Sequence, residues 1–229
     1  MTTVYSLAQS AAKPLLDLGA PRHVDEHGAA RRLARQGRLT EQGRRGVDTL
    51  GRGHIQLSVR AVFHHEPQPL LARAAADRES SAVLVDGVPT RPPRIRYAER
   101  AGLIPGVLAL LPQYTPGTSE FAMIHADAQG SVPAEYATEL TTVRDTIARP
   151  RKGTAMIGLS VCGHAAYDHT RPSLLVLDND DGRYVLGLLN NQHGGTTLLH
   201  HPGSNEVISA WVTSAISDYE AAYEAAGCS

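Results

Sequence analysis

The residues best suited to bond-making chemistry are a thiol, two imidazoles and a carboxylate in one short segment: Cys162, His164, Asp168 and His169. Such groups could hold zinc or form a cysteine nucleophile with its base. No H-E-x-x-H motif and no paired C-x-x-C accompanies them, however, and the nearby GLSVCG is not a G-x-S-x-G elbow. A small metal- or cysteine-dependent hydrolase is therefore kept as the alternative function, and a core cysteine with hydrogen-bonded histidines is the favoured interpretation.

The other candidate metal ligands do not converge on one ion. The sequence has 11 histidines, but the pairs His64-His65 and His200-His201 are adjacent, and neighbouring strand residues point to opposite faces. The segment DNDDG places Gly182 one position too early for an EF-hand loop, and no glutamate follows at the required place. These patterns predict a hairpin turn at DNDDG and neither a metal nor a cofactor.

A basic patch is expected near the N-terminus, where arginines recur between residues 31 and 52. Aromatic residues are only 5% of the chain and none lies in that patch, which argues against base stacking. The formal net charge is -1, and neither G-x-G-x-x-G nor a P-loop motif is present. We therefore expect no nucleic-acid partner, although an arginine-rich nucleic-acid binder is the third hypothesis.

Composition predicts a soluble, cytoplasmic globular protein. The 229 residues are 42% hydrophobic and 20% charged, which is enough apolar material for one sizeable core. Two cysteines are too few for a disulfide framework, and the N-terminal segment lacks the pattern of a signal peptide. No apolar run approaches the length of a transmembrane helix, so membrane insertion is not expected.

Hydrophobic periodicity predicts strands and helices in alternating groups. In the first half, helices are expected over 25–36 and 40–53, followed by strands over 54–65, 70–77 and 81–87 and a helix over 98–112. In the second half, a strand over 119–127 and a helix from Pro133 precede four strands and a long final helix, at 154–163, 172–178, 182–189, 196–201 and 204–227. This order is typical of an α+β fold with a mostly antiparallel sheet.

The order of these segments resembles the EspG family of the type VII (ESX) secretion system. The similarity rests on LLVLDNDDGRYVLGLL followed by TTLLHHPGSNEVISAWVTSAI near the C-terminus. Upstream, LARQGRLTEQGRRGVDTLGRGHIQLSVRAV and RYAERAGLIPGVLALLPQYTPGTSEFAMIHA continue it, so that it runs from about Gly28 to Ala226. Arginine in place of lysine fits a high-GC genome such as that of an actinobacterium.

The resemblance implies a central mostly antiparallel sheet, flanking helical bundles and pseudo-two-fold lobes. It divides the chain into residues 1–24, which could be a short helix or an extended tether, and a single domain over residues 25–229. It also implies a non-catalytic cytosolic chaperone, whose partners are helical secreted proteins such as a PE–PPE heterodimer. The chaperone would keep this client soluble and direct it to the ESX machinery, and self-association of the free chain is left open.

The family has no compact client-contact motif, so the contact residues are an expectation drawn from the predicted elements. A strand and the final helix are expected to form the client face, through Tyr184, Leu186, Leu188 and Trp211. Trp211 lies in the apolar stripe of the helix, so ordinary core packing is favoured for it and a partner-facing anchor is the alternative.

Overall fold

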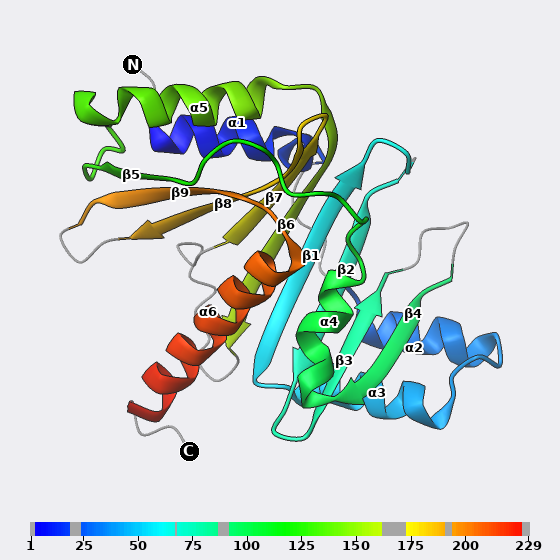
Figure 1. Cartoon of the computed structure of the whole chain (residues 1–229). Helices are drawn as coiled ribbons and strands as arrows, with labels where there is room; N and C mark the ends of the chain where they lie inside the picture. Colours follow the sequence, from blue (N-terminus) through cyan, green and yellow to red (C-terminus); the bar gives the residue numbers. More distant parts are fainter. Residues whose placement is uncertain are drawn as a thin grey trace.

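The computed structural model describes residues 3–18, 24–66, 68–86, 92–161, 173–190 and 194–225. These residues form six α-helices and nine strands, in the order drawn in Figure 1. The elements are α1 (Val4–Leu16), α2 (Glu26–Arg35), α3 (Glu41–Arg52), β1 (Ile55–Phe63), β2 (Leu70–Ala76), β3 (Ser80–Val85), β4 (Arg94–Glu99), α4 (Leu103–Leu108), β5 (Ala122–Ala126), α5 (Ala137–Ala148), β6 (Arg151–Val161), β7 (Ser173–Asn179), β8 (Gly182–Asn190), β9 (Thr196–Pro202) and α6 (Asn205–Ala225).

The nine strands form one open antiparallel sheet in the order β4-β3-β2-β1-β6-β7-β8-β9-β5. Strands β1 and β6 pair at its centre, with Ile55 opposite Val161 and Phe63 opposite Gly153. All the paired strands run antiparallel, which confirms the α+β prediction with its mostly antiparallel sheet. The sheet is open because neither edge strand, β4 or β5, pairs with the other.

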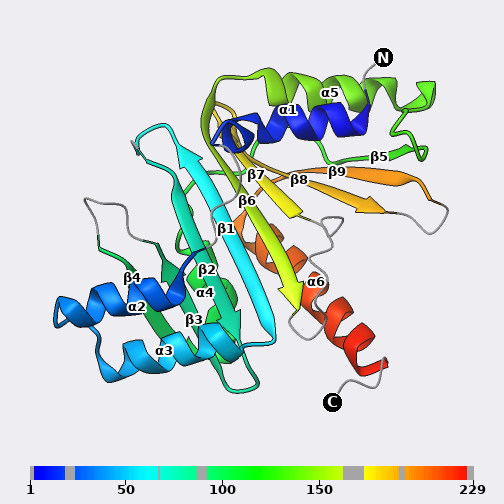
Figure 2. The same ribbon diagram turned by 180° about the vertical axis from the view of Figure 1, so that it is seen from behind.

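The helices cover the two faces of the sheet in different ways (Figures 1 and 2). Helices α4 and α6 pack on one face, where Val107 and Ile208 join the largest core cluster around Leu57. On the opposite face, α1 and α5 cover the strands from β6 to β5, and α2 and α3 cover β2 to β4. Two faces are buried because side chains alternate along each strand and both sets are apolar.

Helix α1 settles the alternatives for the N-terminal segment in favour of a helix. Thr3 caps it by accepting a hydrogen bond from the backbone N–H of Ser6, while Pro14 lies inside the helix. Proline has no N–H, so the carbonyl of Ser10 lacks its ordinary helical donor. Arg151 donates to that carbonyl from Nη2 at 2.7 Å and to the carbonyl of Ala11 from Nη1 at 2.6 Å. The start of β6 therefore holds α1 to the sheet.

Most of the predicted helices and strands are confirmed, and the caps explain where the helices begin. The side chain of Asp25 accepts a hydrogen bond from Gly28 N at the start of α2, and Ser204 does the same for Val207 N at the start of α6. The helix predicted over 98–112 is shorter than expected: β4 takes its first two residues, a 3₁₀ turn follows over Arg100–Gly102, and α4 covers only Leu103–Leu108. The sequence pattern did not predict β4, an edge strand in which exposed arginines alternate with half-buried residues.

The turn predicted at DNDDG joins β7 to β8, and it contains a buried ion pair. Asp178 and Arg183 each have 1% of their surface exposed. The Nε of Arg183 lies 2.7 Å from Oδ1 of Asp178, and its Nη2 lies 2.9 Å from Oδ2. The same Nη2 donates to the carbonyl of Pro112 at 2.7 Å. This bidentate pair ties the hairpin to the chain segment that follows α4.

Candidate functional site

The outer end of the sheet, formed by β8, β9 and β5, carries apolar side chains that no described element covers. Phe121 is 51% exposed, Met123 43% and Leu189 37%. Met123 and Leu189 point to the face on which α6 packs, because their neighbours Ile124 and Leu188 face the core under α1 and α5. Helix α6 runs away from this end of the sheet (Figure 1), so no described helix covers the face of β9 and β5 beside it.

The register of the strands joins these side chains into one surface. Met123 of β5 lies opposite Leu199 of β9, and Leu199 lies opposite Gly187 of β8. A Cβ placed on Gly187 would come within 2.8 Å of the Trp211 ring, so the missing side chain lets Trp211 of α6 lie close to the sheet. We define the open face as the exposed or half-buried apolar side chains in this row and beside it: Phe121, Met123, Leu189, Leu199 and Trp211.

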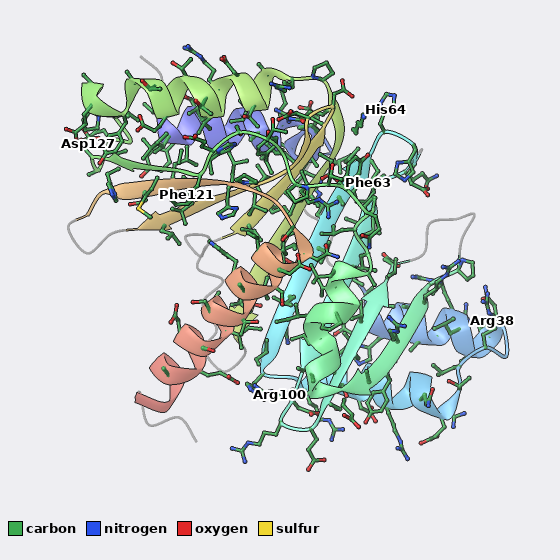
Figure 3. All side chains as sticks on the ribbon, in the orientation of Figure 1. Arg38, Phe63, His64, Arg100, Phe121 and Asp127 are labelled. Atoms are coloured by element: carbon green, nitrogen blue, oxygen red, sulfur yellow. The ribbon has the colours of Figure 1, made fainter. Side chains whose placement is uncertain are left out.

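The open face has a polar border. The ring of His201 lies 5.5 Å from that of Phe121, with the planes tilted by 60°. Further along the strands, Nδ1 of His125 and Oγ1 of Thr197 are 2.9 Å apart, within hydrogen-bond distance. An apolar surface with a polar border is typical of a protein-binding site, in which the apolar centre loses its water on binding. Figure 3 shows Phe121 at the opposite end of the molecule from Arg38 of the arginine-rich segment.

The residues predicted for this role lie on two different faces. Tyr184 and Leu186 are buried, with 0% and 3% of their surface exposed, and they face α1 and α5 with the half-buried Leu188. Trp211 lies on the other face, where it is half-buried against the core cluster of α4 and α6. The predicted strand, β8, therefore does border the open face. The predicted residues alternate with those that point to this face, such as Leu189.

Sequence reasoning missed Phe121, Met123, Leu189 and Leu199. The strand AMIHA contains a signal for Met123. Ala122, Ile124 and Ala126 alternate along it and are buried, so Met123 occupies an outward position where a polar residue is expected. The signal for Leu199 and Leu189 is weaker, since both belong to runs that are apolar at every position. The positions of α1, α5 and α6 decide which of the two faces the described helices leave uncovered.

His200 is a buried titratable group on the inward face of β9. It has 0% of its surface exposed, and its ring stacks on Tyr184 with a centroid distance of 5.1 Å. Burial lowers its pKa from 6.5 to about 4; the backbone of Glu120 opposes this shift and the charge of His201 adds to it. The backbone of Glu120 is near the ring, but neither ring nitrogen makes a hydrogen bond of good geometry to a described residue. The imidazole is therefore neutral in the folded chain at neutral pH.

We expect the folded state to lose stability on acidification through this residue. The pKa of His200 is lower in the folded chain than in the unfolded one, so the unfolded chain binds more protons as the pH falls from 6.5 towards 4. Integrated down to about pH 5, this linkage removes about 2 kcal/mol of unfolding free energy relative to neutral pH. Urea unfolding at both pH values measures it, and His200→Phe should remove the difference; an equal loss in wild type and variant would contradict the assignment.

The residues of the hydrolase alternative, Cys162, His164, Asp168 and His169, lie outside the described residues. Within the part of the chain that the structure describes, no group of three His, Cys, Asp or Glu side chains could hold a metal ion. No helix among the described residues is long and apolar enough to cross a membrane.

Comparison with known proteins adds one finding. A family model described as the EspG family matches residues 19–214, which is most of the chain and includes every residue of the open face. No curated protein matches the chain.

Proposed function

The chain belongs to the EspG family of ESX secretion-associated chaperones, and we propose that it binds a helical PE–PPE-like secretion substrate in the cytosol. In this role it keeps the client soluble and directs it to the ESX machinery. The family is non-enzymatic, which leaves the hydrolase alternative without support. The proposal requires a surface for an apolar helical client.

The open face is the observation that supports this role. An exposed apolar helical tip aggregates, so a chaperone must offer it an apolar surface of comparable size. The side chains of Met123 and Leu199 provide such a surface on the sheet. Trp211, which projects from α6, borders this surface on one side. An amphipathic helix that lies beside α6 would bury its apolar side against the sheet and keep its polar side in water.

We propose that the direct contacts come from Trp211 and the rest of the open face. Tyr184, Leu186 and Leu188 lie on the other side of β8. They contribute to the client face indirectly, because their packing in the core holds β8 in place. The rigid indole of Trp211 is the strongest candidate for an anchor, because aromatic side chains that fill a partner's pocket dominate binding energies.

We also infer that residues 25–229 form one domain, on whose sheet the preceding helix α1 packs, and that its two halves are related by a pseudo-two-fold axis between β1 and β6. Each half has a four-stranded antiparallel meander, β1 to β4 or β6 to β9, followed by a helix, α4 or α6, on the same face. The pairs α2–α3 and α1–α5 would be the flanking bundles on the other face. This symmetry would make the open face a feature of the second half, with β5 added at its edge.

Co-expression tests the proposed function. The full chain, produced with a PE–PPE-like heterodimer encoded beside its gene, is expected to form a complex that survives size-exclusion chromatography. A heterodimer that aggregates alone should stay soluble with the chaperone. Clean separation of the chain from every such heterodimer would overturn the proposal. In the absence of client, we expect any self-association of the chain to use the open face, so client should dissociate such a dimer.

A further inference from the structure

The segment that leads into β5 crosses the β7–β8 hairpin before it reaches the open face. We call residues 112–121 the strap, since they run from the end of α4 to the start of β5 and end at Phe121. Two backbone hydrogen bonds hold its middle to Arg183, one from Arg183 N to the carbonyl of Thr115 at 2.8 Å and one from Gly117 N to the carbonyl of Arg183 at 2.9 Å. The ring of Tyr114 lies 5.5 Å from the Arg183 guanidinium.

The last residues before Phe121 are held by a different group, the hydroxyl of Tyr184. Ser119 N donates to Oη of Tyr184 at 3.1 Å, and Oη donates to the carboxylate of Asp181. Asp181 also accepts from Oγ1 of Thr118 at 2.8 Å. The bonds from Tyr184 and Thr118 lower the pKa of Asp181, so it remains a charged acceptor at neutral pH.

The strap also lies directly on the ring of Tyr184. A Cβ placed on Gly117 would come within 2.0 Å of that ring, so only glycine allows the strap to approach so closely. Tyr184 is fully buried beneath it, whereas Phe121, two residues beyond Ser119, is half exposed at the open face. The ring of Tyr184 thus supports the strap at Gly117, and its hydroxyl binds the strap at Ser119, two residues before Phe121.

We propose that Tyr184 is a positioning residue for client binding, which orients Phe121 through the hydrogen bond from Ser119 to its hydroxyl. This inference rests on the proposed function and on the open face as the client site. Without the hydroxyl, Ser119 N and the Asp181 carboxylate lose a shared partner. The end of the strap then has more conformational entropy, which is lost on client binding and weakens the affinity. Tyr184 acts on the client without touching it.

A double-mutant cycle tests the proposal, with affinity measured against the PE–PPE-like heterodimer that co-purifies with the wild-type chain. Tyr184→Phe keeps the ring and removes the hydroxyl. It should weaken binding by about 5- to 10-fold, and Phe121→Ala should weaken it by about 30-fold. In the Phe121→Ala background, Tyr184→Phe should have almost no further effect, because the residue that it positions is absent. Circular dichroism should show that each variant is folded.

Two further variants separate positioning from general stability. Tyr136→Phe is the matched control, because Tyr136 packs in the same core cluster and its hydroxyl has no hydrogen-bond partner among the described residues; binding should not change. Thr118→Val, at an exposed site of the strap, removes a bond to Asp181 and should weaken binding in the same direction as Tyr184→Phe.

Each failure has a different meaning. A strong effect of Phe121→Ala with none from Tyr184→Phe would overturn the positioning role while leaving the open face in place. An equal loss from Tyr184→Phe with and without Phe121 would show that Tyr184 acts through something else, which also overturns it. If Phe121→Ala binds the heterodimer as wild type does, the open face itself is the wrong site and the inference fails with it.

Discussion

Asp178→Ala is expected to lower the free energy of unfolding by about 3–5 kcal/mol, the usual result of removing one partner from a buried ion pair. Arg183 would keep its charge and its 1% exposure, with the carbonyl of Pro112 as its remaining side-chain acceptor. Urea unfolding followed by circular dichroism measures the loss.

An exposed ion pair beside it provides the control. Asp180 and Lys152 also form an ion pair, with Oδ1 and Nζ 2.9 Å apart, but their side chains are 62% and 48% exposed. Asp180→Ala should therefore change the stability by less than about 1 kcal/mol. The double variant Asp178→Leu with Arg183→Met should be more stable than Asp178→Ala, since it leaves no unpaired charge. A small loss in Asp178→Ala, similar to that of the control, would show that Arg183 finds solvent or another acceptor.

Local sequence patterns predicted most of the elements because short-range physics decides them. The apolar stripe of α6 is predicted from the spacing of its residues alone, and in the structure Ile208, Val212 and Ile216 of this stripe join the core. The same reasoning missed β4, whose exposed arginines and preceding prolines resemble a loop. Edge strands carry such charges to prevent pairing with other chains, so their pattern differs from that of central strands.

The candidate site was harder to predict because it depends on contacts between distant segments. The sequence indicated β8 and Trp211, yet the residues chosen on β8 have the inward parity. In a strand that is apolar on both sides, as β8 is, Leu188 and Leu189 look alike, and only the placement of α1, α5 and α6 distinguishes them. The strap is equally non-local, since Ser119 and Tyr184 meet only in the folded chain.

Met123→Glu is expected to abolish most client binding, with a loss of affinity of at least about 100-fold, or about 2.7 kcal/mol. Met123 lies on the edge strand β5, at the outer end of the open face and opposite Leu199, so a client helix that covers this row would bury the new carboxylate without a partner. The free chain should fold normally, because Met123 is 43% exposed and the glutamate can remain in water until client binds.

Leu16→Glu is the matched control for this substitution. Leu16 is also an exposed apolar residue, at 56%, but it lies at the end of α1 on the opposite face of the sheet from the open face. The same chemical change at this position should leave client affinity within about twofold of wild type, as expected for a surface site away from the interface. A general effect of added negative charge would weaken both variants equally.

The most direct test of the central claim is a calorimetric titration of the PE–PPE-like heterodimer into the wild-type chain, Met123→Glu and Leu16→Glu. We predict tight binding by the wild type and by Leu16→Glu, and binding that is at least about 100-fold weaker with Met123→Glu. Binding by Met123→Glu that equals the wild type, from a folded variant, would show that the client docks elsewhere and would remove the open face from the account.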